Sequence, residues 1–78
     1  MTQFEKDMAV PLNYNGTDIP RGYYNLVMSI RDVSLFSKGI KPHRNWRLKD
    51  VKMYFGISGS TDKVLSELNH IKDVLTQE

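Results

Sequence analysis

The final part of the chain has the clearest helical pattern. Val64, Leu68, Ile71 and Leu75 recur at spacings of four, three and four residues. This repeat places side chains on one face of an α-helix. The charged residues between them fall on the opposite face, so the pattern predicts an amphipathic helix over residues 60–76.

A second, shorter apolar face precedes it. Leu48 and Val51 share one side of a helix predicted over residues 45–55, with Asn45 as its expected N-cap. Gly56 follows, and glycine readily adopts the left-handed backbone that closes many helices.

Residues 20–38 are apolar around most of a helical circumference. Asp18 followed by Pro20 is typical of a helix start, and Gly39 is typical of a helix end. The letters YNLVMSI also alternate as a strand would, so an α+β fold with residues 22–30 as a strand is an alternative. An uninterrupted strand of about 15 residues would be unusual, so the length of the whole apolar segment favours the helix.

Three apolar residues lie off the main face of this central helix: Met28, Leu35 and Phe36. A chain of 78 residues without cysteine has a small core and no disulfide to strengthen it. Self-association or a protein partner would bury these side chains, so we expect them at an interface.

The beginning of the chain shows no helical repeat. Asn15 and Gly16 form a strong tight-turn pair, which allows a short hairpin within an otherwise irregular segment over residues 1–19. The predicted fold is therefore all-α: a small three-helix domain over residues 20–78 that follows this segment.

Composition excludes several chemistries. There is no cysteine for zinc or nucleophilic chemistry, and neither the serines nor the carboxylates occur in a catalytic motif. We expect no enzyme activity, no metal and no cofactor. No segment approaches the roughly 20 apolar residues of a membrane span, and the first residues do not form a secretory signal, so a cytoplasmic protein is expected.

Positive charge is concentrated in one segment. Six of the eleven lysines and arginines lie between residues 38 and 52, where the only acidic residue is Asp50. Such a segment attracts phosphates, although it can also be an ordinary solvated surface. The residues expected to contact the phosphate backbone of a nucleic acid are Lys41, His43, Arg44, Trp46 and Arg47. Trp46 either covers the start of the second helix or offers its ring for stacking.

The stretch L-K-D-V-K-x-Y-F-G-I-S-x-x-T resembles the opening of lactose-repressor-type helix-turn-helix DNA-binding domains. The resemblance implies that Gly56 makes the turn, Ile57 plugs it and Ser58 caps a second helix that enters the major groove. It would place four residues against DNA: Gly59, Ser60, Asp62 and Lys63. The chain departs from the family at Lys52, where a small residue is usual, and at Asp62, where an apolar one is usual.

Two functional hypotheses follow. The first is a small non-enzymatic helical module for protein interaction or oligomerisation. The alternative is a small helix-turn-helix-like nucleic-acid-binding regulator that uses the basic 38–52 segment, with Ser60 and Lys63 at the start of the last helix.

Overall fold

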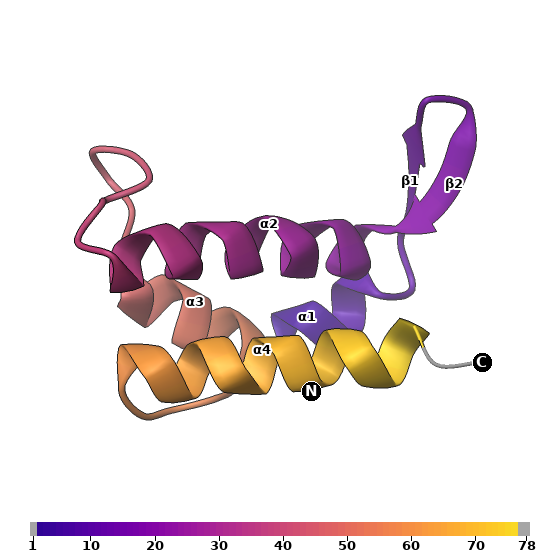
Figure 1. Cartoon of the computed structure of the whole chain (residues 1–78). Coiled ribbons are helices and arrows are strands. Elements are labelled where there is room, and N and C mark those ends of the chain that lie inside the picture. The colour runs from indigo at the N-terminus through magenta and orange to yellow at the C-terminus, as the bar shows by residue number, and fades with distance from the viewer. Residues whose placement is uncertain (1, 77–78) are drawn as a thin grey trace.

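The computed structural model describes residues 2–76 and is mostly helical, with one small sheet (Figure 1). The elements in chain order are α1 (Gln3–Asp7), β1 (Pro11–Tyr14), β2 (Thr17–Pro20), α2 (Arg21–Ser37), α3 (Leu48–Phe55) and α4 (Thr61–Thr76). The three predicted helices are present as α2, α3 and α4. Residues 22–30 belong to α2, so the alternative prediction of a strand there is wrong. The all-α prediction is only partly correct, because the β1–β2 hairpin is present besides the helices.

Helix α1 lies in the segment expected to be irregular. Thr2 and Glu5 form a capping box: the Glu5 N–H donates to Thr2 Oγ1 at 3.2 Å, and the Thr2 N–H donates to Glu5 Oε1 at 3.5 Å. The helix packs on the start of α2 at Gly22, where a Cβ atom would lie 2.9 Å from the Phe4 carbonyl oxygen. A larger residue at position 22 would therefore push α1 away.

The β1–β2 hairpin forms because its turn residues tolerate left-handed backbone. Asn15 and Gly16 have φ angles of 53° and 79°, as the tight two-residue turns of hairpins require. The strand β2 runs directly into α2, whose N-cap is Pro20 rather than a capping side chain. Asp18, expected near a helix cap, instead accepts a hydrogen bond from Asn13 Nδ2 across the hairpin at 3.2 Å.

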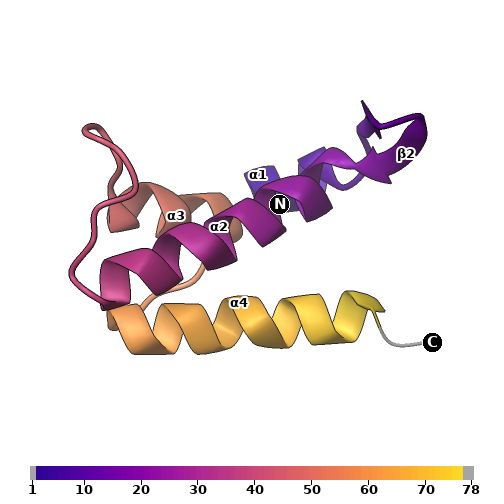
Figure 2. The ribbon, with the colours of Figure 1, turned by 45° about the horizontal axis from the view of Figure 1, so that its top comes forward.

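Helices α2 and α4 lie side by side and run in opposite directions, while α1 and α3 follow one another along one side of this pair (Figures 1 and 2). The most buried side chains come from the α2–α4 contact: Leu26, Val33, Val64 and Leu68, each fully buried. Figure 2 shows α4 diverging from α2 towards its C-terminal end. The apolar face of α4 is consequently buried only in its first half, and Leu75 is 42% exposed.

The second predicted helix is shorter than expected. It starts at Leu48, with Arg47 as its N-cap, so Asn45 lies in the preceding loop as an exposed residue. It ends as predicted at Gly56, which has a left-handed φ of 68°. A Cβ atom on Gly56 would also lie 2.6 Å from Thr2 Cγ2, because the start of the chain packs on this turn.

Candidate nucleic-acid interface

The basic segment between α2 and α3 is fixed to the core by one aromatic residue. Trp46 is only 7% exposed, and its ring lies 4.8 Å from that of Phe36 between centroids. The backbone N–H of Trp46 donates to the His43 carbonyl oxygen at 3.1 Å, which closes a turn in the loop. The side chain thus covers the core next to α3. The expectation that Trp46 contacts nucleic acid is corrected, because the ring is not accessible for stacking.

The other predicted loop residues are accessible. Lys41, His43, Arg44 and Arg47 are all exposed in the segment between α2 and α3. The loop leaves α2 through Gly39, whose φ of 85° reverses the chain, and the Ile40 N–H donates to the Leu35 carbonyl oxygen at 2.9 Å. The loop is therefore anchored at both ends, while its charged side chains face solvent.

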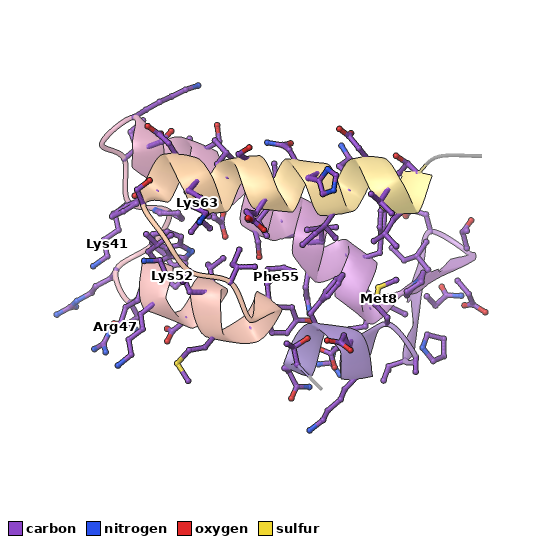
Figure 3. The ribbon with its side chains drawn as sticks, turned by 90° about the horizontal axis from the view of Figure 1, so that it is seen from below. Met8, Lys41, Arg47, Lys52, Phe55 and Lys63 are labelled. Atoms are coloured by element: carbon purple, nitrogen blue, oxygen red, sulfur yellow. The ribbon has the colours of Figure 1, made fainter. Side chains whose placement is uncertain are left out.

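Basic side chains from three elements collect at the end of the molecule where this loop lies (Figure 3). Lys41 and Arg47 come from the loop, Lys52 from α3 and Lys63 from the first turn of α4. We define these four residues together with Arg44 as the basic end. Lys52 was counted in the basic 38–52 segment but was not among the expected contact residues, because it stood where the helix-turn-helix family has a small residue.

Within the part of the chain that the structure describes, no carboxylate forms an ion pair with the basic end. Among residues 2–76, the single ion pair within 4.0 Å joins Arg31 to Asp32, at 3.5 Å on α2. The nearest acidic residues in sequence, Asp50 and Asp62, are exposed and form no such pair with a described residue. The cations therefore keep their full attraction for an external anion.

The turn between α3 and α4 places the first turn of α4 at the same end of the molecule as this loop (Figure 3). Ile57 is half-buried, as a residue that plugs the turn should be, and its N–H donates to the Lys52 carbonyl oxygen at 3.0 Å. The expected cap at Ser58 is wrong: α4 begins at Thr61, and Ser60 Oγ accepts from the Lys63 N–H at 3.3 Å.

The four residues implied to face DNA are exposed: Gly59, Ser60, Asp62 and Lys63. The stem of Lys63 folds back over the turn, since a Cβ on Gly59 would lie 2.6 Å from Lys63 Cδ. Gly59 and Ser60 offer little that could distinguish one base from another. The start of α4 thus contributes a charge at position 63 and almost no sequence-reading surface.

The predicted interface residues are each half-buried within the chain. Phe36 is engaged by Trp46 and packs against the core cluster. Met28 lines a shallow hollow at the hairpin end of α2, together with Ile19, Tyr23, Tyr24 and Val27. Of the three, Met28 is the one that belongs to an apolar surface hollow.

A polar cluster that the sequence did not suggest joins α1, α2 and α3. The Tyr54 hydroxyl donates to Asp7 Oδ2 at 2.6 Å and accepts from Asn25 Nδ2 at 2.9 Å. Gln3 Nε2 donates to the other carboxylate oxygen at 3.0 Å. The hydrogen bond from Tyr54 holds the pKa of Asp7 below its ordinary value, with smaller contributions from Gln3 and the Arg21 charge. Burial raises the pKa of Tyr54, and the Asp7 carboxylate raises it further.

This cluster gives a pH-dependent prediction. Tyr54→Phe is expected to lower the free energy of unfolding at neutral pH by about 1 kcal/mol, because loss of the hydroxyl removes one of the two hydrogen bonds to Asp7 and the acceptor of Asn25 Nδ2. Since the folded-state pKa of Asp7 is lowered, its contribution is complete above the unfolded-state value of about 4 and is lost as pH falls through the folded-state value. Urea unfolding of both proteins at pH 7 and pH 3 measures this, and the difference between them should shrink at pH 3. An equal difference at both pH values would contradict the assignment of Asp7 as the partner.

Neither a metal site nor a membrane-spanning helix is found among the described residues. Residues 2–76 contain no group of three or more histidine or acidic side chains that could hold a metal ion. Within the same part of the chain, no helix has both the length and the apolar character needed to cross a bilayer. Searches of protein-family models, curated proteins and solved structures gave no match to this chain.

Proposed function

We propose that this protein is a small, non-enzymatic nucleic-acid-binding domain that contacts phosphates through its basic end. The observation that carries the proposal is the convergence of unpaired cations from the loop, α3 and α4 on one end of the fold. Lysine and arginine bind nucleic acid chiefly by neutralising phosphates and releasing condensed counterions. Five cations held on anchored backbone can do this without a large rearrangement.

Sequence preference is expected to be weak. Just before α4, Gly59 has no side chain and Ser60 has a short one, and Asp62 in the first turn would repel a phosphate. The exposed face of α4 also carries both signs of charge, with Asp62 and Asp73 besides Lys63. Contacts to the backbone position a protein on nucleic acid but do not by themselves carry base information.

The proposal is tested by titrating the protein against a labelled DNA duplex at several salt concentrations. Five phosphate contacts should give a slope of log K against log salt of about −4.5. A mass measurement by light scattering in the same buffers determines whether the binding unit is a monomer or an oligomer. Absence of binding at about 50 mM salt, where such contacts are strong, would refute the proposal.

A protein-interaction or oligomerisation module remains the second candidate. It is favoured by the apolar hollow at the hairpin end, where Val27 is 39% exposed beside half-buried Met28. The two functions occupy different surfaces, so they are compatible. A strict monomer at high micromolar concentration in the light-scattering experiment would rule out self-association and leave only a different protein as the partner.

A further inference from the structure

We infer that the basic end binds double-helical nucleic acid in preference to single strands. This inference rests on the proposed function and adds the form of nucleic acid that is bound. Three observations carry it. The phenylalanine and tryptophan rings near the cations are not exposed, the surface hollows are not lined by cations, and a duplex has a higher density of phosphate charge than a single strand.

Single-strand binding depends on exposed aromatic rings. Proteins that bind single strands combine a basic groove with rings on which bases stack, each worth about 1–3 kcal/mol per base. None of the phenylalanine, tyrosine or tryptophan side chains that the structure describes is exposed. At the basic end, Trp46 and Phe36 pack on one another with an interplanar angle of 49°. Splayed bases would find none of these larger rings to stack on, and the exposed ring in the loop is the imidazole of His43.

Three surface hollows among the described residues have no cation in their lining. One is formed by the residues before the hairpin and by the base of the hairpin itself, the second lies between α2 and α3, and the third lies at the start of α2. None of these three is lined by a lysine or arginine, and the second includes the carboxylates Asp32 and Asp50. An unstacked base entering one of them would leave its phosphate without a cation from the basic end.

A duplex suits an array of point charges better than a single strand. It carries one negative charge per about 1.7 Å of its axis, and each neutralised phosphate releases more counterion than on a single strand. With neither stacking nor base insertion to compensate, the electrostatic contribution determines the preference. The cations of the basic end should therefore favour the form with the higher charge density.

The single tryptophan of the chain provides an independent readout. Because Trp46 is buried next to the cations, its fluorescence reports stacking without a label on the protein. Duplex binding through phosphates should leave its emission wavelength and intensity nearly unchanged. Stacking of a base on the ring would quench it.

The test compares a labelled DNA duplex of about 20 base pairs with one of its own strands at about 50 mM salt, by fluorescence anisotropy and Trp46 emission. We expect the duplex to bind at least about tenfold more tightly, with Trp46 emission unchanged in both titrations. Equal or tighter binding of the single strand, or quenching of Trp46 by it, would overturn the preference for duplex while the proposed function stands. Binding of neither form would overturn both.

Discussion

Reversing Arg44 and Arg47 together to glutamate is expected to weaken duplex binding by at least about tenfold at 0.1 M salt. Both side chains are exposed in the loop between α2 and α3, and neither has an ion-pair partner among the described residues. Each lost phosphate contact should also reduce the salt slope by about one, so the double variant should bind with a slope smaller by about two. Anisotropy titrations across a range of salt concentrations measure both quantities.

A charge-matched control separates local contacts from net charge. Lys6 lies on α1 and Lys72 lies near the C-terminal end of α4, and both places are away from the basic end (Figure 1). Lys6→Glu plus Lys72→Glu changes the net charge by the same amount but should leave the salt slope unchanged. Far-ultraviolet circular dichroism verifies that both variants are folded. Equal loss of affinity in the two variants would show that overall charge, rather than the basic end, governs binding.

Trp46→Ala is expected to lower the free energy of unfolding by about 3 kcal/mol or more. The ring is buried against Phe36 and belongs to the core cluster with Val51 and Phe55. Its removal leaves a cavity and frees the basic loop from its anchor. A domain of this size is stable by only about 4–12 kcal/mol, so the loss is a large fraction of the total. Urea unfolding followed by circular dichroism measures it.

Two further variants make this result specific. Trp46→Phe keeps most of the buried area and should recover much of the stability, whereas Met53→Ala removes a side chain that is 68% exposed on the neighbouring helix. The Met53 variant should change stability by no more than about 0.5 kcal/mol. If Trp46→Ala costs as little as Met53→Ala, then Trp46 does not anchor the loop, and the argument that it is inaccessible to bases fails with it.

Helix positions were largely predictable because helices bury one face. The repeat of Val64 and Leu68 locates α4, and both side chains are fully buried against α2. The same repeat continues to Leu75, but this side chain is 42% exposed because α4 diverges from α2. The repeat could not predict that exposure, since the spacing of residues on one helix does not determine the angle between two helix axes.

Helix α1 was missed although a signal was present. Thr2, with Glu5 three positions later, is a capping-box pattern, but a five-residue helix has too few residues to show a hydrophobic repeat. What holds α1 in place comes from elsewhere in the chain. Phe4 lies 4.9 Å from the ring of Phe55, and Asp7 accepts a hydrogen bond from Tyr54.

The candidate site was predicted in part. The loop cations were recognisable because they are close together in sequence, and Lys63 was suggested by the helix-turn-helix resemblance. Lys52 was not, since its place at the basic end depends on how α3 lies beside the loop. Trp46 could not be assigned from the sequence, because a tryptophan among basic residues suits both a stacking platform and a core plug.

The sequence by itself determined the three longer helices, the turn at Asn15 and Gly16, the end of α3 at Gly56 and the concentration of positive charge between residues 38 and 52. These features are local, since periodicity, turn conformation and charge density depend on residues that are neighbours along the chain. The tertiary structure alone decided that Trp46 is buried, that Lys63 joins the loop cations and that Tyr54 donates to Asp7, 47 positions away. Such contacts arise when separate elements pack around one core, so no single segment of the sequence contains them.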